Sequence, residues 1–184
     1  MYFEPKTITL KDGRTAILRS PLPEQDAEDM RQYLLDISAE TPFVLNYPED
    51  WGYLTVEKEK ELLQRHLDDP NGLMIVAEVD GRIAGNCHIG FNLKLKTCHR
   101  GSIAIGLRQV YWNLGIGTAM FREMIGAARQ RGSVTQLELE FIEGNSRARA
   151  LYEKMGFRIT GMRPNATRLK DGTLLNEYEM VKEL

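Results

Sequence analysis

The middle of the chain carries a strand-like segment, Ser102–Leu107, followed by the glycine turn Leu114-Gly115-Ile116-Gly117. Met120 and Met124 then continue a four-residue apolar spacing, which predicts a helix directly after the glycines, ending near Gly132. The free N–H groups and positive dipole end of such a helix suit a phosphate group. Met120 stands where a dinucleotide fingerprint needs a third glycine, and no P-loop lysine is present. Taken alone, the two glycines also fit a plain strand-to-helix turn, so at this point the ligand stays open.

Turn and capping signals divide the rest of the chain into alternating strands and helices. Asp-Gly tolerates the positive φ of a tight turn, so three such pairs predict three antiparallel hairpins, at Asp12-Gly13, Asp80-Gly81 and Asp171-Gly172. We expect helices from Pro23 and after the cap Thr55, strands at 73–79, 82–91, 102–107 and 135–141, and a short helix opened by Asn145 or Ser146 and ended by Gly156. This order predicts an α/β fold in which helices flank a mixed central sheet, in a single domain over residues 1–184.

Composition excludes several classes of function. The chain has 24 Lys and Arg against 26 Asp and Glu in 184 residues, and no basic stripe, so we expect no nucleic-acid partner. The longest apolar run, Leu73 to Ala77, is far too short to span a membrane, and no leader segment is evident. Two cysteines cannot form a dense disulfide framework, which favours the cytoplasm. The sequence is compatible with a homodimer and does not fix the oligomeric state.

Two motifs, in order, are similar to those of a known family. The segments are Leu107–Thr118, LRQVYWNLGIGT, and Asn145–Phe157, NSRARALYEKMGF. The first resembles the pyrophosphate loop of the GNAT superfamily of acyl-CoA-dependent N-acetyltransferases, and the second resembles that family's N-x-x-A-x-x-L-Y-x-x-x-G-F helix. The resemblance implies a GNAT fold that transfers an acetyl group from acetyl-CoA to a primary amine, of a small molecule or a protein, by direct attack in a ternary complex. The alternative is a non-catalytic acyl-CoA-binding sensor or regulatory module.

One part of the loop departs from the family pattern. Trp112 occupies the usual place of Arg or Gln, and Leu114 a place often held by Lys or Arg. The backbone N–H groups remain, but a side-chain contact to phosphate is lost. We therefore expect weaker binding of CoA than in members with a basic loop.

The resemblance also assigns candidate cofactor contacts. In the family, the strand before the glycine loop separates from its neighbour, and its backbone pairs with pantetheine. Carried over, this strand is Ile105-Gly106-Leu107, with the Leu107 N–H as a candidate oxyanion donor. Asn145 is a candidate pantetheine contact and a candidate N-cap of its own helix. The full set of cofactor candidates is Ile105, Gly106, Leu107, Asn113, Leu114, Gly115, Ile116, Gly117, Thr118 and Asn145.

Two side chains are candidates for proton transfer. Glu140 lies five residues before Asn145, where the ribosomal-protein N-terminal acetyltransferase branch of the family has a glutamate that acts as a base through water. Glu138 shares the strand face and is the second candidate; both also fit a solvated face. Tyr152 matches the family tyrosine that donates a proton to the departing CoA thiolate, and it also fits the apolar face of its helix.

Other signals are assigned to structure rather than function. Cys87-His88 and Cys98-His99 are adjacent pairs whose side chains point to opposite faces of a strand, so we expect no metal site. His66, at the end of a charged helix, is expected to be solvated. The aromatic and acidic loop over residues 41–53 lies where the family shapes its acceptor pocket, but packing of its rings on the sheet edge is the preferred interpretation.

Overall fold

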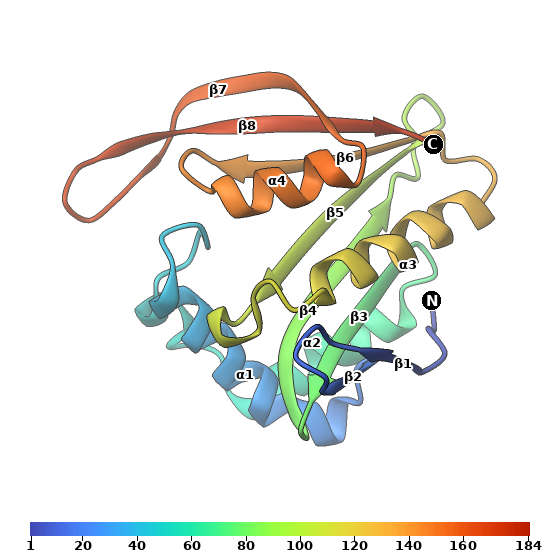
Figure 1. The fold of residues 1–184 in the computed structure, drawn as a ribbon, viewed down its shortest axis with the longest axis vertical. Coiled ribbons are helices and arrows are strands. Elements are labelled where there is room, and N and C mark those ends of the chain that lie inside the picture. The colour runs from blue at the N-terminus through green and yellow to red at the C-terminus, as the bar shows by residue number, and fades with distance from the viewer.

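The computed structural model describes residues 1–184 and confirms the α/β fold class (Figure 1). Eight strands form one mixed sheet in the order β1-β2-β3-β4-β5-β6-β8-β7. Only β5 and β6 pair in parallel; the other neighbours are antiparallel. The strands are β1 (Lys6–Thr9), β2 (Thr15–Arg19), β3 (Gly72–Val79), β4 (Arg82–Phe91), β5 (Arg100–Leu107), β6 (Gln136–Ile142), β7 (Arg158–Arg168) and β8 (Leu174–Glu183).

Four helices cover the two faces of this sheet. They are α1 (Pro23–Glu40), α2 (Val56–Asp68), α3 (Ile116–Gln130) and α4 (Ser146–Lys154), with short 3₁₀ turns at Pro48–Trp51 and Gln109–Tyr111. Helices α1 and α2 pack together on one face, whereas α3 and α4 contribute to the larger core on the other (Figure 1). Helix α3 starts at Ile116, so Gly117 lies inside its first turn rather than before it.

Strand β3 shows why the sheet is covered on both sides. Its side chains alternate: Ile75 and Ala77 belong to the core under α3, and Met74 and Val76 to the core under α1 and α2. A strand of near-continuous apolar residues cannot leave either face in water. The run that begins at Leu73 therefore predicts a central strand with a helix layer on each side.

The predicted turns and caps are confirmed. Gly13, Gly81 and Gly172 all have positive φ in turns between antiparallel strands. The Thr55 side chain accepts a hydrogen bond from Lys58 N–H and caps α2. Gly156, with φ of 88°, follows α4 as a left-handed residue. These features depend on residues close in sequence, which is why the sequence predicts them.

Strands β5 and β6 separate along their length. They pair only at Arg100, Gly101 and Ser102 of β5, after which β5 has no partner on that side. β6 instead continues its pairing with β8 as far as Ile142. The result is a wedge between the two strands, with the C-terminal half of β5 as one wall (Figure 1).

The β7–β8 hairpin extends past the sheet and meets the loop after α1. The Lys170 N–H donates to the Tyr47 hydroxyl at 3.0 Å, and the Lys170 ammonium lies 4.2 Å from the centre of the Tyr47 ring. The same ammonium forms an ion pair with Glu49. The end of the β7–β8 hairpin and the loop after α1 are thus in contact, although they are distant in sequence. None of the helices combines the length and apolar character that crossing a membrane requires.

Candidate active site

The open edge of β5 presents free backbone groups to the wedge. The Arg108 N–H donates to the Ala84 carbonyl at 2.9 Å, so the alternation of an antiparallel ladder directs the Leu107 N–H away from β4. By the same alternation, the Ile105 N–H and carbonyl also face the wedge. The Leu107 carbonyl is different, because the Trp112 indole N–H donates to it at 2.8 Å. The exposed edge therefore offers two donors and one free acceptor.

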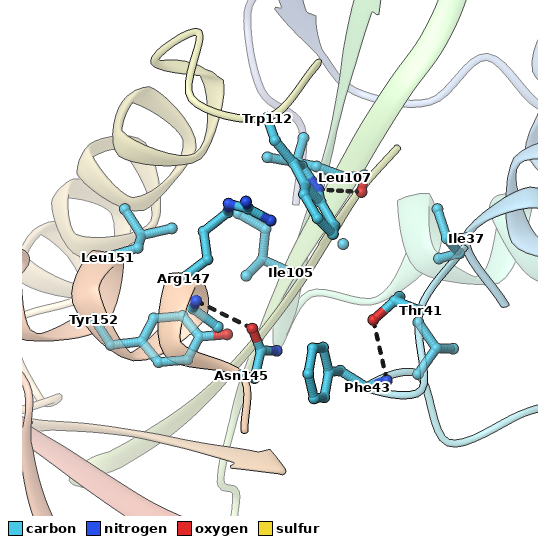
Figure 2. Close-up of a pocket in the computed structure, with 13 residues that line it drawn as sticks. Ile37, Thr41, Phe43, Ile105, Leu107, Trp112, Asn145, Arg147, Leu151 and Tyr152 are labelled. Atoms are coloured by element: carbon cyan, nitrogen blue, oxygen red, sulfur yellow. Dashed lines mark hydrogen bonds between the residues drawn. The ribbon is translucent and has the colours of Figure 1, made fainter. Parts of the chain in front are cut away.

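A pocket of about 670 Å³ lies against this edge (Figure 2). Its walls come from β5, from the start of α4, and from the end of α1 with the loop that follows it. Most of the lining is apolar, and Arg147 is its only charged residue. The lining residues are Ile37, Thr41, Phe43, Val44, Ile105, Gly106, Leu107, Trp112, Asn145, Arg147, Ala148, Leu151 and Tyr152.

Tyr152 lies on the α4 side of this pocket, with the phenol end of its ring directed inward (Figure 2). The residue is 7% exposed and packs between Phe121 and Phe141. Burial raises the pKa of its hydroxyl to about 12, because the phenolate is the form that loses hydration. The hydroxyl makes no hydrogen bond within the chain. The hydroxyl is a protonated donor that is free to bind water or a molecule in the pocket.

The glycine turn opens onto a larger groove of about 1590 Å³ beside the first pocket. Gly115 has φ of 103°, a conformation that a side chain disfavours. A Cβ on Gly117 would lie 2.9 Å from Leu151, so glycine is what lets α3 approach α4. The backbone N–H groups of 116, 117 and 118 have no carbonyl partner in the chain, as at any helix start.

Four cations line the groove although the turn itself has none. Lys11 comes from the β1–β2 turn, Arg122 from α3, and Arg147 and Lys154 from α4; no acidic residue lines the groove. Sequence reasoning missed these residues, because they gather only when three separate elements fold together. The groove is suited to a ligand with several negative charges, and the helix N-terminus adds to this preference.

A third cavity lies on the β6 side and shares Phe43, Ile105, Asn145 and Tyr152 with the first pocket. Its only charged lining residues are Glu140 and Glu177. Glu177, on β8, was also missed by sequence reasoning, because only the pairing of β8 with β6 brings it near Glu140. The groove, the first pocket and this cavity share lining residues, and together we call them the ligand path. Tyr152 and Ile105 lie where the first pocket meets the acidic cavity.

The two candidate bases have different surroundings. Glu138 accepts hydrogen bonds from Arg100 and Gln136, and the Arg100 guanidinium lowers the pKa of its carboxyl. Burial, together with the nearby Glu177 charge, raises the pKa of Glu140. Glu140 lines the acidic cavity, whereas Glu138 does not. Of the two, Glu140 is therefore the better proton acceptor and the one that faces the path.

The aromatic loop after α1 divides between two environments. Thr41, Phe43 and Val44 line the first pocket, and Phe43 also lines the acidic cavity. In contrast, the Trp51 indole N–H donates to the Ser38 hydroxyl at 2.9 Å and packs against α1. Trp51 thus packs on α1 rather than on the sheet edge as expected, while the N-terminal part of the loop forms a wall of the site.

The remaining sequence signals lie away from this path. Cys87 is buried in β4, and Cys98 lies in the β4–β5 loop. His66 is not solvated as expected: it is half-buried, and its ring contacts that of His88 at a centroid distance of 4.9 Å. Nowhere do three or more His, Cys, Asp or Glu side chains converge in a way that could hold a metal ion.

Comparisons with known proteins agree with this geometry. A family model described as "Acetyltransferase (GNAT) family" matches residues 17–157. The L-amino acid N-acetyltransferase AaaT of Escherichia coli (strain K12) is 28% identical over 119 residues, which are 65% of this chain and 73% of that protein. An N-alpha-acetyltransferase of Sulfurisphaera tokodaii is 38% identical over 103 residues, 50% of this chain and 60% of that protein. A crystal structure of a GNAT-family acetyltransferase from Streptococcus pneumoniae has a TM-score of 0.83 at 28% identity and covers 92% of this chain and 99% of its own.

Proposed function

The chain belongs to the GNAT family of acetyltransferases, and we propose that its acceptor is the α-amino group at the N-terminus of a peptide or protein. As a member of that family it is an acyltransferase that moves an acetyl group from acetyl-CoA to an amine. The family match and the named relatives support catalysis over a non-catalytic acyl-CoA sensor. The choice of acceptor rests on the charge of the cavity beside Tyr152.

The donor fits the path in one direction. The cationic groove and the N–H groups at the start of α3 suit the phosphates of acetyl-CoA, and the apolar pocket suits its pantetheine arm. The free backbone groups of Ile105 and Leu107 would pair with the amides of that arm, as an added strand does. In this pose the thioester lies near Tyr152 and Ile105, and the Leu107 N–H is our candidate donor to the thioester oxygen.

The amine must lose a proton before it attacks. A lysine-like amine with a pKa near 10.4 is about 3 pH units from its neutral form at pH 7, whereas an α-amino group, near 8, is only about 1 unit away. We assign Glu140 as the base, acting on the amine directly or through one water. A carboxylate, even with a raised pKa, is far better matched to the α-amino group than to the lysine-like amine. This favours an α-amino acceptor.

We assign Tyr152 as the hydrogen-bond donor to the departing sulfur. With the phenol pKa at about 12 and an ordinary thiol pKa near 8.5, full proton transfer to the thiolate would be uphill by about 5 kcal/mol. A hydrogen bond that strengthens as negative charge builds on sulfur avoids that cost. The thiol can then take its final proton from the ammonium product or from water.

Charge in the acceptor cavity argues against a free amino acid. Glu140 and Glu177 are the only charged residues in its lining. The neighbouring cation Arg163 lies 2.5 Å from Glu177 and 3.8 Å from Glu140, so it is already committed to carboxylates. A free amino acid would bring its own carboxylate into this negative field without a free cation to receive it. A peptide N-terminus carries a neutral amide at the same place. One curated relative is named as an N-alpha-acetyltransferase, and the other as an L-amino acid N-acetyltransferase.

The test is a matched set of acceptors that differ in one group. Acetyl-CoA is the donor, and thiol release is measured with alanine, alaninamide, Ala-Ala-Ala and Nα-acetyl-lysine. In this N-acetyl-lysine the only free amine is the one on the side chain. We expect alaninamide and the tripeptide to react at least tenfold faster in kcat/KM than alanine, and N-acetyl-lysine to react slowest. Alanine reacting as fast as its amide would refute the peptide assignment, and N-acetyl-lysine reacting fastest would refute the α-amino assignment. In Glu177→Gln, the preference for the amide over the acid should shrink.

A further inference from the structure

Arg147 occupies the junction between the cationic groove and the apolar pocket, and it lines both (Figure 2). The other three cations of the groove line the groove alone. No carboxylate lines either cavity, and the Arg147 guanidinium makes no hydrogen bond or ion pair within the chain. Arg147 is the one charged residue that lines both cavities, which also share Leu107, Trp112 and Leu151.

Trp112 holds this guanidinium in position. The Arg147 guanidinium carbon lies 4.0 Å from the centre of the Trp112 ring, within the range of a cation–π contact. The indole is itself fixed, because its N–H donates to the Leu107 carbonyl at 2.8 Å. The order of contacts therefore runs from the end of β5 through Trp112 to the guanidinium.

We propose that Arg147, oriented by Trp112, is a positioning residue that pairs with the diphosphate of the acyl-CoA donor. This inference rests on the placement of the donor described above. The diphosphate joins the nucleotide to the pantetheine arm, so it has to pass where the groove meets the pocket. A guanidinium can contact two phosphate oxygens at once and keep its face on an aromatic ring, which an ammonium cannot do. Because Trp112 is tied to β5, the contact would fix how deep the thioester lies beside Tyr152.

The pair also supplies a cation that the glycine turn lacks. Trp112 and Leu114 bring no charge to the phosphates, and Arg147 reaches them from the neighbouring helix instead. The indole contributes twice, since it orients the guanidinium and occupies the Leu107 carbonyl. The pantetheine arm accordingly has one backbone acceptor fewer on β5, and charge at the diphosphate carries more of the affinity.

The test compares three ligands that differ in their phosphates. Binding of CoA and of 3′-dephospho-CoA is measured by calorimetry, and the second-order rate constant with S-acetylpantetheine, which has no phosphate, is measured at millimolar donor. Arg147→Met should weaken CoA and 3′-dephospho-CoA by the same factor, about tenfold to a hundredfold, and leave the S-acetylpantetheine rate within twofold. Arg147→Lys should recover only part of the loss.

Matched variants separate this role from general effects of the fold. Arg149→Met removes an arginine from the same helix that is paired with Glu153 at 2.8 Å and lines neither cavity, so CoA binding should stay unchanged. Trp112→Leu should weaken CoA more in the native background than in the Arg147→Met background, where the cation–π contact is already absent; the effect that remains there reports the contact of Trp112 with the Leu107 carbonyl and the pocket.

Three results would overturn the proposal. If Arg147→Met lowered the rate constant with S-acetylpantetheine by the same factor as it weakens CoA binding, Arg147 would maintain the shape of the pocket rather than contact the diphosphate. If Arg147→Met weakened binding of CoA but not of 3′-dephospho-CoA, Arg147 would contact the 3′-phosphate rather than the diphosphate. Unchanged binding of both CoA and 3′-dephospho-CoA would show that Arg147 makes no contact with the donor. Failure of CoA to bind the unaltered protein would instead reject the donor placement itself.

Discussion

The backbone of Gly106 lies directly against the hydroxyl of Tyr33: a Cβ built on Gly106 would come within 2.5 Å of that oxygen. Tyr33 is held in place, because it is fully buried and its hydroxyl donates a hydrogen bond to the Asn86 side-chain oxygen at 2.9 Å. Helix α1 therefore sets the position of β5 at the residues whose backbone faces the wedge. The glycine is required by packing against α1, the helix whose C-terminal end also contributes to the pocket wall.

Gly106→Ala should reduce both stability and activity. The added methyl group has to displace Tyr33 or push β5 toward the wedge, which we expect to cost about 1–3 kcal/mol of unfolding free energy. Urea denaturation measures this cost, and the KM for acetyl-CoA should rise in parallel. Gly126→Ala is the matched control: a Cβ there meets nothing within 4 Å, and alanine favours the helix, so stability should stay level or increase. Equal stability of the two variants would contradict this account.

Tyr152→Phe should separate turnover from cofactor binding. The ring still fills its place between Phe121 and Phe141, so CoA affinity and stability should change little. Loss of the hydrogen bond to the leaving sulfur should lower kcat about 10- to 100-fold. Thiol release and calorimetry with CoA measure the two effects. Because the pKa of Tyr152 is about 12, the native enzyme should show no loss of rate from this group below about pH 11. Unchanged kcat would remove Tyr152 from the reaction.

Glu140→Gln should lower kcat about 100-fold and change its pH dependence. The base works only when it is deprotonated, so the kcat of the native enzyme should fall as pH drops through the Glu140 pKa, which is raised above 4.5. That acidic limb should disappear in the variant. Glu138→Gln is the comparison, since its carboxyl is held by Arg100 and has a lowered pKa. If the limb disappears in the Glu138 variant instead, the assignment of the base is reversed.

Glu59→Gln should stabilise the protein, and more so at high pH. Glu59 is 4% exposed, and burial raises the pKa of its carboxyl to about 7. Between the ordinary pKa of 4.5 and about 7, the folded state binds the proton more tightly than the unfolded chain does. The contribution of Glu59 to the free energy of unfolding therefore decreases as pH rises through this range. We expect a gain of about 1–3 kcal/mol at pH 8 and little gain at pH 5.

Chemical denaturation of the two proteins at each pH checks this difference. The native protein alone is not sufficient, because burial lowers the pKa of His66 and His88. The two imidazoles stay neutral in the folded protein and become protonated in the unfolded chain, so they lower the free energy of unfolding as pH falls below about 6.5. This pH dependence is opposite in sign to that of Glu59. A gain from Glu59→Gln that is equal at both pH values would show that the carboxyl titrates normally.

Local sequence signals predicted most of the elements correctly. The three Asp-Gly hairpins, the Thr55 cap and the end of α4 at Gly156 all appear where the sequence places them. Each depends on φ preferences or on hydrogen bonds between residues a few positions apart. The start of α3 was placed slightly late, since Gly117 is helical. The reason is that its small size serves packing against Leu151 rather than the turn.

The candidate site was only partly predictable. Tyr152 and the glycine turn follow from motifs, but Glu177 and Arg147 have no local signal that separates them from other surface charges. Their roles arise from partners that are distant in sequence: Arg163 beside Glu177, and Trp112 under Arg147. Likewise, nothing near Glu138 in sequence reveals that Arg100 binds it through short hydrogen bonds, whereas Glu140 has only the longer contact to Arg163 at 3.8 Å.

Most strands, helices and turns could be predicted from the sequence, because they depend on periodicity and on neighbouring residues, and two of its motifs were enough to show the resemblance to the GNAT family. The folded structure was needed to show where β5 leaves β6, which cations line the groove beside the glycine turn and which carboxylates line the cavity next to Tyr152. These depend on strand order and on contacts between elements up to a hundred or more residues apart, as when Lys170 meets Tyr47. A charged side chain acquires its function from what packs beside it, and that neighbour is absent from its own stretch of sequence.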